Sequence, residues 1–473
     1  MFFSQYINGK LVEGLGKLLE VLNPATGKLI AAVPTASVEQ VEEALQGAAD
    51  AFVSWSKTSI TQREAYIQKL IDVFMENEKL IVDTLIEETG KSADVASYDF
   101  HMLPDCLHYF IEEVKRLNGE MISDYDNGHM NLMVRKPLGV VACHLAWNYP
   151  LLNVGYKMGP ILASGCTCVL KPSSDTPLTT MLVGELIAKA GLPAGVVNVV
   201  VGSGNVISRT MNESVIPSMI TLIGSTDTGR KIIEQSATSV KHFSLEMGGS
   251  APVVVMKDAD AYAAGKYTAD GKTGNSGQVC VAPNRVFVHK DALDEFLRGV
   301  NEYLDQVIYG TGYTTGGNLI GPLVNARAVE RMEALVQDAV EKGAKVLRGG
   351  RRHGTEGFYF EPTVLLNVTP DMRVYQEEIF GPIMPVMTFD DSADVKVLAN
   401  DTQYGLAAYV YTRDLNTALD LGTGIDSGSV CVNEPFYAYQ LPHGGCKQSG
   451  IGKDCSHFSL EEYFTVQRIS IKL

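Results

Sequence analysis

Apolar residues recur at helical spacing through the first quarter of the chain. Between residues 36 and 118, the stretches SVEQVEEALQGAADAFVSW and TQREAYIQKLIDVFMENEKLIVDTLIEETGK place apolar side chains three or four positions apart as far as Gly90. Such spacing is typical of amphipathic helices that bury one face. Ser37 stands at the start of the first stretch, where its hydroxyl can cap the helix. This part of the chain is therefore predicted to be helical.

From about residue 134 the pattern changes to short runs rich in valine and isoleucine. Such runs are VRKPLGVVACHL, CTCVLKPS, GVVNVVVG and MITLIG, and they are separated by helical stretches such as TTMLVGELIAKAG and TGRKIIEQSAT. Repetition of strand, Pro/Gly turn, helix and strand is typical of parallel α/β units. We therefore expect a nucleotide-binding sheet over residues 138 to 245.

The same alternation returns in the second half of the chain. Strand-like APVVVM, NRVFVHK, TVLLNV and AAYVYT alternate with helical stretches such as ARAVERMEALVQDAVEKG, which predicts a second α/β domain over residues 249 to 446. The C-terminal LEEYFTVQRISIKL ends in alternating, β-prone residues. A lone strand needs an edge to pair with. The pattern leaves open whether that edge belongs to the same subunit or to another.

Length and composition describe an ordinary globular chain of more than one domain. The 473 residues are 45% hydrophobic and 20% charged, close to the average for soluble proteins. The net charge of -16 disfavours nucleic acid and anionic membranes as partners. The start, MFFSQYINGK, lacks the pattern of a signal peptide, and no run of eighteen apolar residues occurs. A cytoplasmic protein is the resulting expectation.

Several short motifs could carry chemistry, although each has a plain structural explanation when taken alone. Cys280 follows a turn rich in Gly, Asn and Ser in GNSGQVCVAPNR, where backbone amides can lower a thiol pKa. Glu246 precedes a glycine pair in LEMGGS, and Asn148 lies in the loop AWNYP. The turn GSTDTG stands between a strand and a helix, a place suited to phosphate. The other seven cysteines are interpreted as buried thiols, and no metal site is predicted.

The order of these motifs is more specific than any one of them. A strand followed by WNYP, then KPSSDTP, GSTDTG, LEMGG, GQVC, EEIFGP and PHGGCKQSGIG, resembles the NAD(P)-dependent aldehyde dehydrogenase superfamily over essentially the whole chain. The resemblance implies an α/β fold with a Rossmann-like cofactor domain, an α/β catalytic domain and a small β oligomerisation element. It assigns residues 1–118 and 138–248 to the first, 249–446 to the second, and 119–137 and 447–473 to the third. A homodimer or homotetramer is implied as well.

The resemblance also implies roles for individual residues. Cys280 matches the nucleophile that adds to the aldehyde carbon, Asn148 a donor to the resulting oxyanion, and Glu246 the base that activates water against the thioester. The cofactor is NAD or NADP, and the matching cofactor positions are Lys171, Ser174, Gly224, Ser225, Gly229, Glu378 and Phe380. A relative of this family without catalytic activity is disfavoured, because the three catalytic residue types are all present.

Two positions bear on the choice of cofactor and of substrate. Many members that prefer NAD have a glutamate where this chain has Ser174, so no carboxylate repels a 2'-phosphate and NADP should be accepted. Tyr156 occupies the position of a substrate-binding aromatic residue in aminoaldehyde and betaine-aldehyde dehydrogenases, and the tail PHGG…GKD resembles the same branch. The substrate is therefore expected to be an aminoaldehyde or betaine aldehyde.

Two alternatives remain open. The segment CVAPNR resembles semialdehyde dehydrogenases, which favours a small oxygenated aldehyde such as lactaldehyde or succinate semialdehyde. A CoA-acylating semialdehyde dehydrogenase is the other alternative, and Glu246 speaks against it because that class usually lacks this base.

Overall fold

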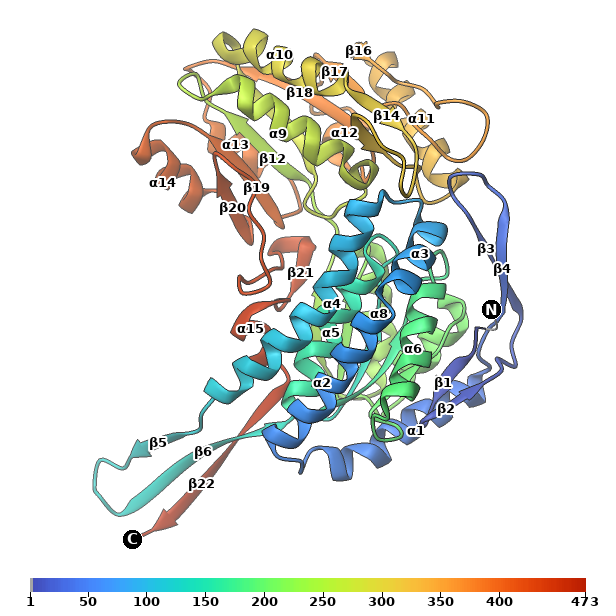
Figure 1. Cartoon of the computed structure of the whole chain (residues 1–473). Helices are drawn as coiled ribbons and strands as arrows, with labels where there is room; N and C mark the ends of the chain where they lie inside the picture. Colours follow the sequence, from blue (N-terminus) through green and yellow to red (C-terminus); the bar gives the residue numbers. More distant parts are fainter. Residues whose placement is uncertain (1–2) are drawn as a thin grey trace.

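The computed structural model describes residues 3–473, which form two α/β units and a protruding β arm (Figure 1). One unit is built on an eight-stranded sheet, the other on a seven-stranded sheet, and the arm on three strands. This arrangement agrees with the predicted fold class.

The predicted N-terminal helices are present, and their ends follow from the sequence. They are α1 (Val38–Trp55), α2 (Ile60–Glu76), α3 (Glu78–Thr89) and α4 (Ala93–Glu113). Ser37 caps α1 as predicted: its side chain accepts a hydrogen bond from the Gln40 amide, and the Gln40 side chain accepts one from the Ser37 amide. Ser59 and Gln62 repeat this capping box at α2.

The first sheet has the order β2-β1-β9-β8-β7-β10-β11-β21, and its strands β9, β8, β7, β10 and β11 run parallel. Its strands are β1 (Gln5–Ile7), β2 (Lys10–Val12), β7 (Val140–His144), β8 (Thr167–Lys171), β9 (Val197–Val199), β10 (Met219–Ile223), β11 (His242–Glu246) and β21 (Gly450–Ile451). The connecting helices are α5 (Pro150–Ser164), α6 (Leu178–Ala190), α7 (Arg209–Glu213) and α8 (Thr226–Gln235). A hairpin of β3 (Leu18–Leu22) and β4 (Leu29–Pro34) is separate from this sheet.

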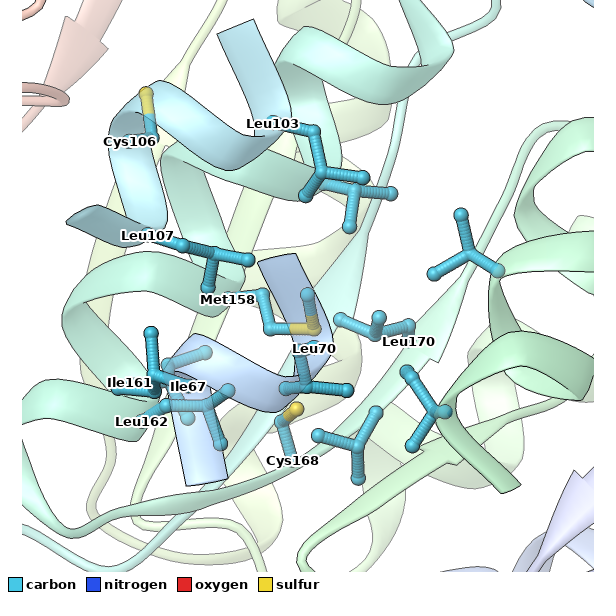
Figure 2. Packing of buried hydrophobic residues seen from close by; sticks show 14 of the residues in the cluster. Ile67, Leu70, Leu103, Cys106, Leu107, Met158, Ile161, Leu162, Cys168 and Leu170 are labelled. Carbon is cyan, nitrogen blue, oxygen red and sulfur yellow. The ribbon is translucent and has the colours of Figure 1, made fainter. Parts of the chain in front are cut away.

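The largest hydrophobic core includes residues of helices α2, α4 and α5 and of the central strand β8. Figure 2 shows Ile67 and Leu70 of α2 close to Leu107 of α4 and to Met158 and Ile161 of α5. Cys168 of β8 lies in this core and is fully buried, so it is a small apolar residue of the interior. Burial of this face fixes α5, and with it the loop that precedes α5.

The second sheet has the order β16-β17-β18-β13-β12-β19-β20 and is parallel except for β16. Its strands are β12 (Ala251–Val255), β13 (Pro283–His289), β16 (Lys345–Arg348), β17 (Thr363–Leu366), β18 (Ile383–Phe389), β19 (Ala407–Tyr411) and β20 (Ser429–Val432). Its helices are α9 (Ala261–Thr273), α10 (Leu293–Leu304), α11 (Ala326–Glu341), α12 (Arg373–Gln376), α13 (Val395–Asn400) and α14 (Leu415–Gly424). β14 (Val307–Tyr309) and β15 (Asn318–Ile320) pair separately.

The terminal strand pairs within its own chain. β22 (Phe464–Lys472) lies antiparallel to β6 (His129–Pro137), which also pairs with β5 (Glu120–Ser123), and the three strands project from the body (Figure 1). The segment 447–473 is divided, however, because β21 pairs with β11 of the first sheet and α15 (Ser456–Glu461) packs on α4 and α5. Within that segment β22 pairs with the arm strand β6, and the assignment of residues 447–473 to an oligomerisation element stays a prediction.

Within residues 3–473, no helix is both long enough and apolar enough to cross a membrane.

Helices α9 and α10 approach each other closely through two glycines. A Cβ atom on Gly265 would lie 2.2 Å from the carbonyl oxygen of Phe296, and one on Gly299 would lie 2.1 Å from that of Tyr262. Backbone atoms cannot move aside as a flexible side chain can, so a methyl group at either position must push the helices apart.

We predict that Gly265→Ala lowers the free energy of unfolding by about 1–3 kcal/mol because of this clash. The matched control is Gly422→Ala in α14, where a Cβ atom would meet nothing within 4 Å; there alanine should stabilise the helix by about 0.5–1 kcal/mol. Urea denaturation of both variants beside the wild type measures the difference. Equal stability of the two variants would contradict the packing described here.

Candidate active site

Most of the predicted site residues of the first unit stand at the carboxyl ends of its parallel strands. Lys171 ends β8 and Glu246 ends β11, while Asn148 lies in the loop between β7 and α5. Ser225 is the N-cap of α8, directly after β10. Loops at this edge of a parallel sheet form the crevice where α/β proteins bind ligands.

Cys280 reaches the same place from the second unit. It lies before β13, at the end of a tight turn in which Asn275, Ser276 and Gly277 all have positive φ angles of 46°, 56° and 71°. A Cβ atom on Gly277 would lie 2.4 Å from the carbonyl oxygen of Gly381, so the turn requires glycine there. Glu378 and Phe380 precede β18, the neighbour of β13.

A cavity of about 560 Å³ lies between these two edges. Nine of the predicted residues line it, namely Asn148, Lys171, Ser174, Gly224, Ser225, Glu246, Cys280, Glu378 and Phe380. The wall includes the N-terminus of α8, whose free amides and positive dipole end suit a phosphate. The structure thus brings together segments that stand as far apart in the sequence as Asn148 and Phe380.

Two predicted residues lie outside the cavity wall. Gly229 is buried inside α8, where a Cβ atom would lie 2.2 Å from the Met247 sulfur. Its position allows α8 to pack closely against Met247, and its role in the phosphate turn stays a prediction. Tyr156 lies on α5 with its ring 6.1 Å from the ring of His443, and it is not part of the cavity wall.

The thiol of Cys280 is close to a carboxylate and an imidazole. Its Sγ atom lies 3.9 Å from Nε2 of His443, and that Nε2 lies 3.5 Å from Oε1 of Glu246. Burial and the neighbouring Glu246 carboxylate raise the pKa of the Cys280 thiol well above its usual value. The thiol therefore needs a proton acceptor beside it, and Glu246 is placed to be one.

Two other groups in the cavity have pKa values close to neutrality because they are buried. Burial raises the pKa of Glu378 to about 7, while its Oε1 accepts a hydrogen bond from the Gly249 amide at 3.0 Å. Burial also lowers the pKa of Lys171 to about 8. The Lys171 ammonium donates to the carbonyl oxygen of Pro172 at 3.2 Å and faces the cavity.

Asn148 is oriented toward the loop that carries the thiol. Its Nδ2 donates to the carbonyl oxygen of Gln278 at 3.2 Å, and the same oxygen accepts from Asn275. A carboxamide has two N–H donors, so the second can serve an oxyanion formed beside Cys280. The site can thus add a thiol to a carbonyl carbon and stabilise the resulting charge.

Sequence reasoning did not single out His443, although PHGG was among the motifs quoted. Its place is fixed by a backbone bridge, since His443 and Asp454 exchange hydrogen bonds of 2.7 and 2.6 Å. Asp454 is in turn paired with Lys157 of α5 at 2.5 Å, with both side chains buried. The sequence signal for His443 is that it is the single histidine of the glycine-rich motif PHGGCKQSGIG.

A nucleotide-sized cavity that ends at a thiol, a carboxylate and a carboxamide defines a cysteine-dependent oxidoreductase. Comparison with known proteins agrees: residues 12–469 match the aldehyde dehydrogenase family. The chain belongs to this family and is an NAD(P)-dependent aldehyde dehydrogenase.

Three relatives illustrate how similar the chain is to proteins with known names. It is 35% identical to the Escherichia coli succinate-semialdehyde dehydrogenase [NADP(+)], over 99% of this chain and 97% of that protein. It is also 35% identical to E. coli lactaldehyde dehydrogenase, over 99% of this chain and 98% of that protein. Betaine aldehyde dehydrogenase from Staphylococcus aureus in complex with NAD+ superposes with a TM-score of 0.95 at 32% identity, covering 99% of this chain and 94% of that one.

Proposed function

We propose that this enzyme oxidises a small oxygenated aldehyde to its carboxylate by way of a thioester on Cys280. The observation that carries the proposal is the convergence of Cys280, Glu246 and His443, whose polar atoms lie within 4.8 Å of one another beside the cofactor-sized cavity.

In the first step, the Cys280 sulfur forms a bond to the aldehyde carbon. The thiol proton passes to the Glu246 carboxylate, and the carbonyl oxygen becomes an oxyanion next to the side-chain amide of Asn148. The bound dinucleotide supplies the acceptor for the hydride that leaves the same carbon. Loss of that hydride leaves a thioester on Cys280.

Hydrolysis of the thioester is assigned to Glu246. Its side chain is only 5% exposed, and its Oε1 has no hydrogen-bond partner within the described part of the chain. After it has released the thiol proton to solvent through the cavity, the ionised Glu246 carboxylate beside the acyl carbon can accept a proton from water and so generate the nucleophile. This placement favours water over CoA as the acyl acceptor.

The cavity fits a dinucleotide, and its polar groups favour NADP+ over NAD+. Ser174 donates to the Gly202 carbonyl at 3.4 Å and adds no negative charge, while Lys171 and Lys231 line the same wall. Two ammonium groups attract a 2'-phosphate and no carboxylate at position 174 repels it. At the other end, Glu378 can accept hydrogen bonds from a ribose hydroxyl.

For the aldehyde, the small oxygenated class is better supported than the aminoaldehyde or betaine class predicted from the tail motifs. The semialdehyde and lactaldehyde dehydrogenases are relatives at 35% identity over nearly the whole chain. Beside Cys280, the imidazole of His443 can donate a hydrogen bond to a hydroxyl or carboxylate oxygen, and the rings of Tyr156 and Tyr437 lie next to that imidazole.

A betaine-like substrate is a second candidate because of the same aromatic rings. Tyr156 and Tyr437 both lie with ring centroids 6.1 Å from the ring of His443. Aromatic faces attract quaternary ammonium groups. The uncharged walls would then hold the cation, and His443 would face the aldehyde.

We further propose that the chain assembles into a homodimer or homotetramer through the arm. Met121 and Ile122 of β5 and Val466 and Ile469 of β22 are exposed apolar residues on this thin sheet. An apolar surface of this kind, without a core beneath it, is typical of an interface between subunits.

The substrate proposal predicts the order of kcat/KM in a panel of four aldehydes with NADP+. Lactaldehyde or succinate semialdehyde should exceed aminobutyraldehyde and betaine aldehyde by at least about tenfold, and His443→Phe should remove most of that preference by removing a donor. A higher value for betaine aldehyde would favour the second candidate. Inactivity toward all four aldehydes would contradict the proposal.

The cofactor proposal predicts a pH dependence that is specific for NADP+. With a pKa of about 8, Lys171 is mostly charged at pH 7 and about nine-tenths neutral at pH 9. Affinity for NADP+ should therefore fall by up to about tenfold between these pH values, while affinity for NAD+ changes little.

Lys171→Arg is the matched control, because a guanidinium stays charged at both pH values. Equilibrium binding of the two nucleotides measures the effect. Parallel pH profiles for NAD+ and NADP+ in the wild type would show that Lys171 does not contact the 2'-phosphate.

A further inference from the structure

Three side chains at the end of the cavity carry donor atoms that zinc prefers. They are the Cys280 thiol, the His443 imidazole and the Glu246 carboxylate, and their donor atoms all lie within 4.8 Å of one another. Thiolate sulfur, imidazole nitrogen and carboxylate oxygen are the usual ligands of Zn²⁺ in proteins, and three such ligands plus water form an open tetrahedral site.

The distances between the donor atoms fit one tetrahedral ion. Bond lengths of about 2.3 Å to sulfur and about 2.1 Å to nitrogen and oxygen place neighbouring ligand atoms about 3.4–3.6 Å apart in a tetrahedron. The observed Sγ–Nε2 separation is 3.9 Å, and the Nε2–Oε1 separation is 3.5 Å. The third separation, between the Cys280 sulfur and a carboxylate oxygen of Glu246, is within 4.8 Å, so the side chains must rotate to bring all three atoms to ligand distance.

The electrostatic situation of the cluster also favours a divalent cation. Oε1 of Glu246, on a side chain 95% removed from solvent, has no hydrogen-bond partner in residues 3–473. A thiolate at Cys280 would add a second negative charge beside it, and like charges in a buried site repel each other strongly. A divalent cation between them replaces repulsion with attraction on both sides.

The three ligands are held by different, well-fixed elements. Glu246 ends β11, Cys280 follows the strained turn before β13, and His443 is bridged to Asp454 by two backbone hydrogen bonds. Because Cys280 and Glu246 line the cavity of about 560 Å³, an ion can reach the cluster from solvent. The ligands thus converge without a large backbone movement.

We propose that Cys280, Glu246 and His443 form a zinc-binding site that reversibly inhibits the enzyme. The sulfur forms a bond to Zn²⁺, the thiol proton is released to buffer, and no oxidation or reduction takes place. Zinc-bound sulfur cannot attack an aldehyde, and zinc-bound Glu246 cannot accept a proton. Zinc and aldehyde therefore exclude each other, while the wall of the cavity that holds the dinucleotide stays free.

The test is direct zinc binding to the full chain, measured by competition with a fluorescent chelator after treatment with EDTA. Wild-type protein should bind one Zn²⁺ per subunit at this site, and Cys280→Ser, Glu246→Gln and His443→Phe should each weaken binding by at least about tenfold, equivalent to about 1.4 kcal/mol. His108→Phe, which changes an exposed histidine on α4, is the matched control and should bind zinc as the wild type does. Retained NADP+ binding identifies the variants that are folded.

A second readout is alkylation of Cys280 by iodoacetamide, followed by mass spectrometry of its peptide. Zinc should protect Cys280 from alkylation in the wild type and in His108→Phe, but not in His443→Phe. Addition of EDTA to the zinc-treated wild type should make Cys280 reactive again. Unchanged zinc affinity in all three ligand variants, or binding at exposed sites only, would overturn the proposal. Since neither readout uses an aldehyde, failure here is distinct from failure of the proposed function.

Discussion

The site depends on the close approach of two backbone segments where the sheets meet. A Cβ atom on Gly249 would lie 2.6 Å from the carbonyl oxygen of Cys280, and one on Gly248 would lie 2.5 Å from Oε2 of Glu378. The Glu378 side chain could move aside, but the Cys280 backbone could not, so glycine is required at position 249. Without this pair, the thiol loop could not come close to the end of β11, and Glu246 and Cys280 could not share a proton.

Several charged groups at this junction are buried, and one pair of them fixes the segment that carries His443. Lys157 and Asp454 form an ion pair that holds the C-terminal segment against α5, and Asp454 in turn fixes the backbone of His443. Burial keeps the Cys280 thiol protonated until a base accepts its proton. An imidazole and a carboxylate thus lie beside the thiol. We propose that this arrangement serves the aldehyde reaction and also allows zinc to bind and inhibit the enzyme.

Local features were predictable from the sequence, whereas relations between distant segments were not. The helical spacing of residues 36–118 and the cap at Ser37 depend on neighbours in the chain, and both predictions are confirmed. The close packing of Gly229 against Met247 could not be predicted in this way, because it depends on a residue eighteen positions away. The place of His443 beside Cys280 could not be predicted either, because 163 positions separate the two residues. The division of residues 447–473 between the first sheet and the arm depends on the pairing of β21 with β11 and of β22 with β6.

The central claim is that Cys280 carries the acyl group and that Glu246 is needed to release it. The most direct measurement mixes Glu246→Gln with NADP+ and a substrate aldehyde at a pH high enough to ionise the thiol, while NADPH absorbance and the intact mass of the protein are followed together. The account predicts a burst of about one NADPH per active site and a mass increase equal to the acyl group on Cys280, followed by very slow turnover. Steady turnover at the wild-type rate, with no adduct on Cys280, would contradict it.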